Sequence, residues 1–230
     1  ITVPGILDDE KKILISAPPL KARNYDFTKL ISAIDYPVVV MNDARAEAYA
    51  DHWFNGKPQD EKIYIMLGEG VGGAYINASA IRNGVHNRGG EFGHMVIHPE
   101  GKQCLCGKKG CFEAYVSEKV LSSELDMTLD NFFELAAQGN KNNSNVLDEY
   151  MDNLALGINN IYTMMDCDIV LGGTVAPYLK QYDNSIKERL VNDYSFDTDA
   201  DYLRISDGGG RKSGLGAALS FVARFIDGVE

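Results

Sequence analysis

The sequence predicts an α/β fold in which short buried strands alternate with helices. Apolar runs of strand length end in polar or glycine turns, as at Pro37–Met41 and Asp168–Leu171. Apolar residues recur with the helical period in Leu129–Ala137 and Val146–Met165. Segments of these two kinds follow one another along most of the 230 residues, which is the pattern of an α/β protein.

The first part of the chain begins abruptly. Ile1–Gly5 is typical of a strand end that runs into a turn, so we expect the chain to be a fragment whose first strands lie upstream. The elements expected next are a strand at Ile13–Ile15, a loop at Ala17–Leu20, a helix at Phe27–Ile34, a buried strand at Pro37–Met41 and an alanine-rich helix at Ala44–Trp53.

Glycine-rich turns follow the strands of the remaining chain. A strand at Lys62–Leu67 enters a glycine hairpin at Gly68–Gly73 and continues as a strand at Ala74–Ile76. Because a dinucleotide fingerprint needs a helix after its glycines, this hairpin excludes that motif. The later elements expected are mostly helical structure from Glu113 to Ile161, a strand at Asp168–Leu171, a helix at Tyr178–Val191, a strand at Tyr202–Ile205 and a helix at Ser213–Ile226.

The composition is that of an ordinary globular protein, with 45% apolar and 24% charged residues. A net charge of −11 argues against binding a nucleic-acid phosphate backbone through this segment. No apolar run in the sequence reaches membrane-spanning length, so no membrane partner is expected. Three clustered cysteines, with Cys167 standing alone, favour metal ligation in a reducing cytoplasm over a disulfide framework.

The stretch Gly89–Glu113 holds three of the four cysteines, Cys104, Cys106 and Cys111, among several glycines. Three thiolates and one imidazole form a common tetrahedral set for structural zinc. The alternative is three unrelated thiols in a glycine-rich loop, which such tight spacing disfavours. The residues alone leave the fourth ligand open, because both His94 and His98 lie upstream of the cysteines.

Asp43 follows an apolar strand directly and precedes a helix. Ligands of open α/β sheets bind at that edge, where a carboxylate can act as general base on a hydroxyl. The alternative is that Asp43 only caps the helix.

Three glycine clusters each follow a predicted strand, at Gly68–Gly73, Gly172–Gly173 and Gly208–Gly210. Together they suggest a sheet edge that a nucleotide approaches closely, although each is also explained by a tight turn. Glu91 and Glu113 flank the metal loop, so a structural zinc would fix both, whereas the alternative makes them solvated loop charges.

These motifs resemble the ROK family, a name that covers repressors, open reading frames and sugar kinases. The family pattern Gly-Glu-x-Gly-His is present as Gly90–His94, and Cys-x-Cys-Gly-x-x-Gly-Cys-x-Glu as Cys104–Glu113. The match favours His94 over His98 as the zinc ligand. Further family landmarks occur in order along the chain, at Val3–Gly5, Asn42–Asp43, Leu171–Gly173 and Gly214–Ala218.

The resemblance implies an actin/hexokinase-like (ribonuclease H-like) ATPase fold with two α/β lobes and an incomplete N-terminal lobe. Residues 1–45 would be the remainder of that lobe. Residues 46–230 would form the C-terminal lobe with the zinc loop at 89–113, and the last helix would pack back on the N-terminal lobe. Family members are commonly homodimers or homotetramers, so the same is expected here.

The resemblance also implies roles for individual residues. Asp43 would deprotonate a sugar hydroxyl that attacks the γ-phosphate of Mg²⁺-bound ATP. A structural zinc would be held by four ligands, and other residues would bind the two substrates. The implied sugar ligands are Asn42, Glu91, His94 and Glu113, the glycines implied at ATP are Gly70, Gly72, Gly172 and Gly173, and the zinc ligands are His94, Cys104, Cys106 and Cys111.

Three features depart from the family pattern. The family's Asp-x-Gly-Gly-Thr phosphate loop is absent from this chain. Glu69 replaces the threonine of the glycine hairpin, and its carboxylate would repel phosphates or turn away. Pro19 replaces the asparagine of an Ala-Pro-Asn-Leu motif that often lies near the sugar.

Two functions are therefore compatible with the sequence. The first is ATP-dependent phosphorylation of a hexose or N-acetylhexosamine, which the retained Asp43 favours. The second is the sugar-sensing domain of a ROK-type transcriptional regulator, which Glu69 favours.

Overall fold

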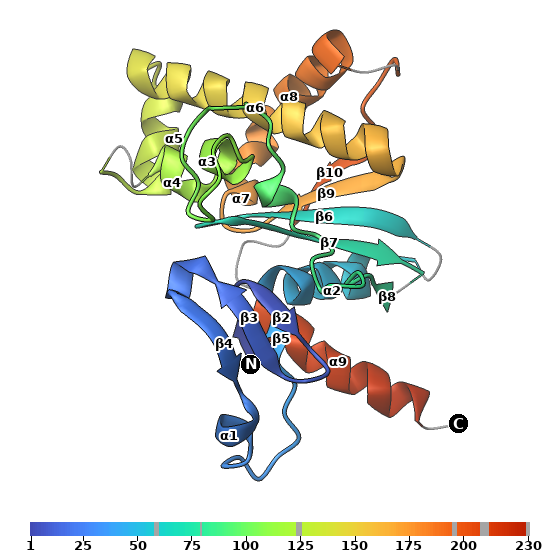
Figure 1. Ribbon diagram of the computed structural model, residues 1–230. Coiled ribbons are helices and arrows are strands. Elements are labelled where there is room, and N and C mark those ends of the chain that lie inside the picture. Colours follow the sequence, from blue (N-terminus) through green and yellow to red (C-terminus); the bar gives the residue numbers. More distant parts are fainter. Residues whose placement is uncertain (58–59, 79, 123–125, 195–196, 208–211, 229–230) are drawn as a thin grey trace.

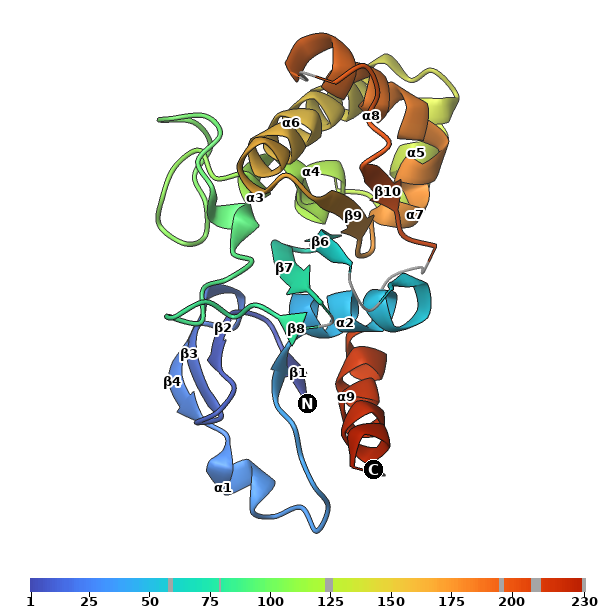
Figure 2. The same ribbon diagram turned by 90° about the vertical axis from the view of Figure 1, so that its right-hand side faces the viewer.

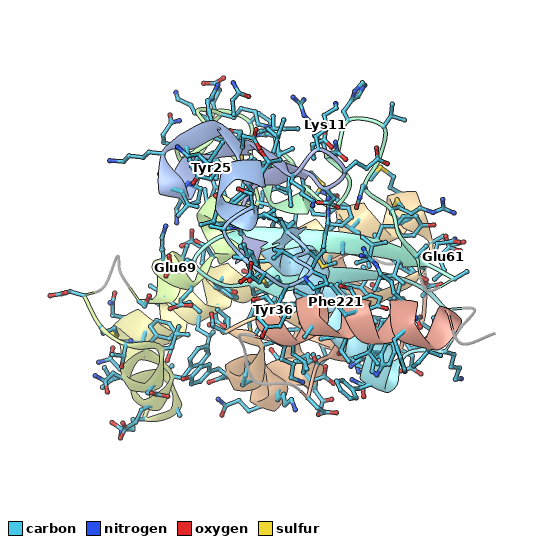
Figure 3. All side chains as sticks on the ribbon, turned by 90° about the horizontal axis from the view of Figure 1, so that it is seen from below. Lys11, Tyr25, Tyr36, Glu61, Glu69 and Phe221 are labelled. Carbon is cyan, nitrogen blue, oxygen red and sulfur yellow. The ribbon has the colours of Figure 1, made fainter. Side chains whose placement is uncertain are left out.

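The computed structural model describes residues 1–57, 60–78, 80–122, 126–194, 197–207 and 212–228. A five-stranded mixed sheet with strand order β10-β9-β6-β7-β8 lies at its centre (Figure 1). β10, β9 and β6 are parallel, whereas β7 and β8 are antiparallel. Glu61 and Glu69 lie on opposite sides of the molecule in Figure 3 and mark the two ends of β6. The strands are β6 (Glu61–Leu67), β7 (Val71–Asn77), β8 (Ala80–Ile81), β9 (Asp168–Gly172) and β10 (Leu203–Ile205).

Helices cover both faces of this sheet, and the strand period of two sorts its side chains between them. Ile63 and Ile65 pack into the large core under α6 (Lys141–Met165). Tyr64, between them, packs with Ala48 of α2 (Asp43–Asn55) on the opposite face. The alternation explains why β6 is buried on both sides.

Several short helices complete the layer that contains α6. The sequence predicted one helix at Tyr178–Val191, and the structure corrects this to four successive helical pieces between Ala176 and Tyr194. The path changes at Tyr182, whose φ of −109° interrupts the regular α geometry. The helical segments are α3 (Glu113–Val116), α4 (Glu118–Leu121), α5 (Leu129–Ala137), α7 (Ala176–Leu179), 3₁₀ η4 (Lys180–Tyr182), α8 (Asp183–Arg189) and π-helical η5 (Leu190–Tyr194).

The N-terminal residues form two small sheets beside α2 (Figure 2). One is antiparallel with order β2-β3-β4, and in the other β1 pairs in parallel with β5. Val3, Leu7 and Leu14 share a small core of their own. The elements are β1 (Thr2–Val3), β2 (Ile6–Asp8), β3 (Ile13–Ala17), 3₁₀ η1 (Pro18–Leu20), β4 (Ala22–Asp26), α1 (Thr28–Ile31) and β5 (Met41–Asn42).

Two expectations for this part were wrong. The helix expected at Phe27–Ile34 is the single turn α1, because only Phe27 is buried while Leu30 and Ile34 are exposed. Without a buried face, a short helix has too little packing to extend. Of the strand expected at Pro37–Met41, only Met41 belongs to a strand, β5.

Two helices, α2 and α9 (Ser213–Asp227), lie against each other below the central sheet (Figure 1). Gly216 of α9 faces the carbonyl of Ala46, where a Cβ would overlap that oxygen. Asp51 of α2 is held by Arg204 at 2.6 Å and by the hydroxyl of Ser206 at 2.9 Å. These contacts fix α2 and therefore the Asp43 at its N-terminus. Among the described residues, no helix has the length and apolarity needed to cross a membrane.

Candidate functional site

A long loop between β8 and α3 carries the cysteines and folds back on itself through two glycines. Gly107 and Gly110 have φ of 92° and 75°, a conformation that glycine adopts without strain. At Gly110 a Cβ would also overlap the carbonyl of His98. Phe112 is fully buried and packs against Gly157 of α6, where any larger residue would collide with the ring. The loop is thus anchored to the core directly beside its last cysteine.

Four potential metal ligands, His94, Cys104, Cys106 and Cys111, come together in this loop. Their ligand atoms lie within 4.8 Å of one another. The Sγ atoms of Cys106 and Cys111 are 3.7 Å apart, as are Cys104 Sγ and His94 Nδ1. A tetrahedral zinc with bonds of about 2.3 Å has ligand–ligand distances of about 3.8 Å. The two pairs at 3.7 Å match this value, and the limit of 4.8 Å for all four atoms means that the residues present fit a zinc ion after small side-chain shifts.

The three thiols differ in acidity. Burial raises the pKa of Cys104 and Cys111, whereas the burial of Cys106 is outweighed by hydrogen bonds and the Lys108 charge, so that its pKa is lowered. His98, the other histidine of the loop, lies outside the cluster. Its Nε2 is 2.6 Å from Asn153 Oδ1 and its ring packs edge-on against Tyr115.

Two carboxylates contact the cluster from outside. His94 Nε2 lies 3.8 Å from Glu91 Oε2, on the ring side opposite Nδ1. Glu113 Oε1 lies 3.7 Å from Cys104 Sγ, and its Oε2 accepts a hydrogen bond of 2.9 Å from Val71 N. The Glu91–His94 separation exceeds a hydrogen-bond distance, so the two side chains are neighbours without a direct hydrogen bond. Through its contacts with Cys104 and Val71, Glu113 links the metal loop to the glycine hairpin.

Asn42 and Asp43 form the N-terminus of α2. Asn42 Oδ1 accepts from Arg45 N at 2.9 Å and so caps the helix, while its Nδ2 donates to the carbonyl of Gly5 at 3.0 Å. Asp43 Oδ1 accepts from Ala44 N at 2.8 Å. Asn42 is therefore the side chain that caps α2.

Two of the carboxylates, Asp43 and Glu91, have raised pKa values. Burial raises the pKa of Asp43 above its ordinary value of 3.8, and the N–H of Ala44 opposes the shift. Burial also raises the pKa of Glu91; the Glu113 and Asp43 charges add to this, while His94 and Arg45 act against it. Glu91 is therefore within electrostatic range of two other acids and two basic side chains.

A cavity of about 450 Å³ opens on the Glu91 and His94 side chains. Ile6 and Phe92 supply apolar walls and Lys108 lies at its rim. This volume is within the range of small-molecule sites. Asp43 is not among the residues that line it.

The four glycines expected at ATP each lie against the protein's own atoms. A Cβ on Gly70 would meet Glu113, one on Gly72 would meet Ala44, and one on Gly172 would overlap the hydroxyl of Tyr64. Gly173 has a φ of 84° and backs onto the Leu67 backbone. Close packing is thus sufficient to require Gly72, Gly172 and Gly173, whereas at Gly70 the atom met is the flexible end of the Glu113 side chain. The Gly208–Gly210 cluster lies outside the described residues.

Glu69 and the Pro18–Leu20 turn are the two departures from the family pattern that the structure describes. Glu69 is exposed at the tip of the β6–β7 hairpin, and Figure 3 shows it at the edge of the molecule. Pro18–Leu20 forms the exposed 3₁₀ turn η1.

Sequence reasoning missed Arg45, which is 3% exposed and bonds to the backbone that precedes Glu91. A weak signal was available, since an arginine two residues after Asp43 lies between two alanines, Ala44 and Ala46, of the predicted helix.

Comparison with known proteins finds similarity both to sugar kinases and to repressors. It is 32% identical over 178 residues to the xylose repressor of Bacillus subtilis strain 168, covering 74% of this chain and 46% of the repressor. It is 35% identical over 119 residues to the glucokinase of Streptomyces coelicolor, covering 51% and 38% of the two chains. The chain spans about half the length of the curated relatives that it matches first.

The fold is shared with a solved structure, a ROK family glucokinase from Streptomyces griseus in complex with glucose and AMPPNP. The two chains superpose with a TM-score of 0.80 at 26% identity, over 94% of this chain and 78% of the glucokinase. The predicted hexokinase-like α/β fold and the predicted resemblance are both confirmed. Because the ROK family model matches residues 1–222, the chain belongs to the ROK family.

Proposed function

We propose that this protein binds a monosaccharide, a hexose or N-acetylhexosamine, and catalyses its phosphorylation by ATP. Asn42, Asp43, Glu91, His94 and Glu113 are the proposed sugar ligands. The observation that carries the proposal is that Glu91 and Glu113 both lie beside the metal-ligand cluster, with Glu91 and His94 lining a cavity of about 450 Å³. Sugars present many hydroxyl groups, and ordered carboxylates are strong acceptors for them.

Asp43 is the proposed general base. Its carboxylate would accept the proton of the sugar hydroxyl that attacks the γ-phosphate. Burial raises its pKa, which moves it from an ordinary surface acid toward a useful base. Its position at the N-terminus of α2, fixed by Asn42 and by the α2–α9 packing, would keep the carboxylate in place before the sugar binds.

The metal is proposed to have a structural role. His94, Cys104, Cys106 and Cys111 would fill all four positions of a zinc ion and leave none for water. When bound, the ion would supply order to the loop. His94 and Glu113 would then be fixed toward the sugar. His94 is itself a proposed ligand of the ion, and Glu113 Oε1 lies 3.7 Å from the Sγ atom of the proposed ligand Cys104.

The nucleotide is proposed to be Mg²⁺-bound ATP, with Gly70, Gly72, Gly172 and Gly173 at its phosphates. Support for ATP comes from the family, since the related Streptomyces griseus glucokinase was solved with AMPPNP. Glu69, which is exposed, would have to turn away from the phosphates.

A second candidate function is that of a sugar-responsive regulator without kinase activity. Glu69 in the glycine hairpin favours it, because a carboxylate at that position disfavours a polyphosphate. The similarity to xylose repressors gives equal support from the family. Both candidates require the same sugar site and differ only in phosphoryl transfer.

The test is sugar-dependent ADP release by the full-length protein, measured with glucose, mannose, xylose, N-acetylglucosamine and N-acetylmannosamine. Calorimetry with the same sugars runs in parallel. Turnover with one sugar that Asp43→Asn abolishes supports the kinase. Sugar binding without turnover contradicts the kinase and supports the regulator, and absence of binding by all five sugars contradicts both.

A further inference from the structure

Arg45 is a buried arginine in the first turn of α2, and it reaches away from its helix to another part of the chain. Its Nη2 donates to the carbonyl oxygens of Asn87 at 2.9 Å and of Gly89 at 3.4 Å. Only 4% of its side chain is accessible to solvent. A charged group buried to this extent is retained where it forms specific contacts.

A third segment joins this contact. Asp9, in the turn between β2 and β3, lies with its Oδ2 3.6 Å from Arg45 Nη1. The same oxygen accepts a hydrogen bond of 3.0 Å from Asn83 Nδ2. Figure 2 shows the loop that follows β8 passing directly over β2. Arg45 and Asp9 together therefore tie the N-terminal sheet, α2 and the loop into one polar cluster.

Glu91 lies between two anchors of the same loop. On one side are the carbonyls of Asn87 and Gly89 that Arg45 holds, and on the other is His94 of the metal-ligand cluster. The guanidinium is also near enough to the Glu91 carboxylate for their opposite charges to attract. The zinc ligands alone would fix the loop only from His94 onward.

We propose that Arg45 is a positioning residue for the sugar site, which holds residues 87–89 against α2 and so fixes Glu91 relative to Asp43. The role in sugar binding rests on the proposed function, whereas the anchoring of the loop does not. Arg45 makes no contact with the sugar itself. The planar guanidinium bonds two carbonyls through Nη2 and places Nη1 3.6 Å from the Asp9 carboxylate, which the single ammonium of a lysine does not reproduce.

The test compares Arg45→Met and Arg45→Lys with Arg82→Met, an exposed arginine on the same loop that serves as the matched control. Backbone hydrogen exchange of residues 87–91 measures the anchoring, and calorimetry with the sugar that the wild type binds measures the positioning. Zinc content and circular dichroism establish that each variant is folded. Asp9→Asn, which lies in a turn, supplies a milder disturbance of the same cluster.

We expect Arg45→Met to raise exchange at 87–91 and to weaken sugar affinity about tenfold or more, the effect of losing charged hydrogen bonds. Arg45→Lys and Asp9→Asn should fall between wild type and Arg45→Met, and Arg82→Met should match wild type. A folded, zinc-containing Arg45→Met with wild-type exchange at 87–91, or with the sugar affinity of Arg82→Met, would overturn the proposal.

Failure of the proposed function gives a different result. A wild-type protein that binds none of the five sugars contradicts the sugar site and the role of Arg45 in it. Exchange at 87–91 still decides whether Arg45 anchors the loop. The two ideas are therefore separable in one set of samples.

Discussion

The metal loop and the glycine hairpin are both rich in glycine, but their surroundings differ. The metal loop brings four ligand atoms within 4.8 Å, and Glu91 and Glu113 lie next to two of them. The hairpin side brings glycines against Glu113, Ala44 and Tyr64 of the same chain. Packing alone does not explain the arrangement in the metal loop, because it brings ionisable side chains together. The arrangement in the hairpin is accounted for by packing.

This difference shows how unequally the two halves of the proposed reaction are supported. Side chains that converge on a site without being needed for the core are evidence for a ligand. Glycines that fill tight contacts are required with or without one. The proposed sugar half is therefore supported by contacts around Glu91, His94 and Glu113, and the proposed ATP half depends on family membership.

The largest expected effect concerns catalysis on the sugar side. Replacing Asp43 by Asn keeps the shape and removes the base, so sugar-dependent ADP release should fall by about 10²- to 10⁴-fold. Sugar affinity should change little, since an amide still bonds a hydroxyl. A variant with wild-type turnover would exclude Asp43 as the base and leave the sugar side with binding residues only.

Loss of the metal should disturb the sugar side and leave the nucleotide side unchanged. In Cys106→Ser we expect zinc to be lost and sugar affinity to fall about 10- to 100-fold, because the loop loses its order. Cys167→Ser, outside the cluster, is the control and should retain both properties. Metal analysis and calorimetry give the two readings. A zinc-free variant with unchanged affinity would separate the metal from the sugar.

The pH dependence of turnover reports on Asp43. Because burial raises its folded-state pKa above 3.8, turnover should fall about tenfold per pH unit once the pH drops below that raised value.

The same pKa shift of Asp43 affects stability in the opposite sense. Burying the ionised carboxylate costs stability above the folded-state pKa, and this cost is absent below 3.8. Asp43→Asn should accordingly raise the Tm at pH 7 and lose this advantage under acid conditions. An equal Tm at pH 7 would contradict the burial.

The packing explanation for the nucleotide-side glycines is tested by stability. Gly172→Ala should lower the free energy of unfolding by about 1–3 kcal/mol, because the Cβ would collide with Tyr64. Gly214→Ala is the matched control, since it has open space in α9 and should be neutral or slightly stabilising. Denaturant unfolding measures both. If Gly172→Ala is as stable as Gly214→Ala, packing against Tyr64 does not require this glycine.

The smallest effect is expected at Glu69. Since its carboxylate is exposed, Glu69→Thr should tighten ATP binding only about 1.5- to 5-fold and leave sugar affinity unchanged. Nucleotide titration of wild type and variant makes the comparison. Equal ATP affinity in the two proteins would show that Glu69 already points away from the phosphates.

Much of the candidate site was predictable because its residues are close in sequence. Cys104 and Cys111 are seven positions apart, and glycines between them leave only compact loop paths. The α/β alternation likewise predicted the central strands and α6, whose apolar period is long and regular. The position of Asp43 at the start of α2 followed from the apolar run before it.

Other features depend on contacts between distant segments and were not predictable. β4 reads ARNYD, with no alternation of apolar and polar residues, and it is a strand because it pairs with β3. Phe27–Ile34 has helical spacing but lacks a partner to bury it beyond one turn. Arg45 contacts residues more than forty positions away, so no local pattern reveals its partners.

Calorimetric titration of the wild-type protein and of Glu91→Gln with the five sugars tests the central claim most directly. Glu91 lies between the Arg45 contacts and the metal-ligand cluster, and glutamine keeps its shape while removing the charge. We predict that the wild type binds at least one sugar, and that Glu91→Gln binds it about tenfold or more weakly with its zinc retained. Absence of binding by the wild type, or equal affinity in Glu91→Gln, would contradict a sugar site at this loop.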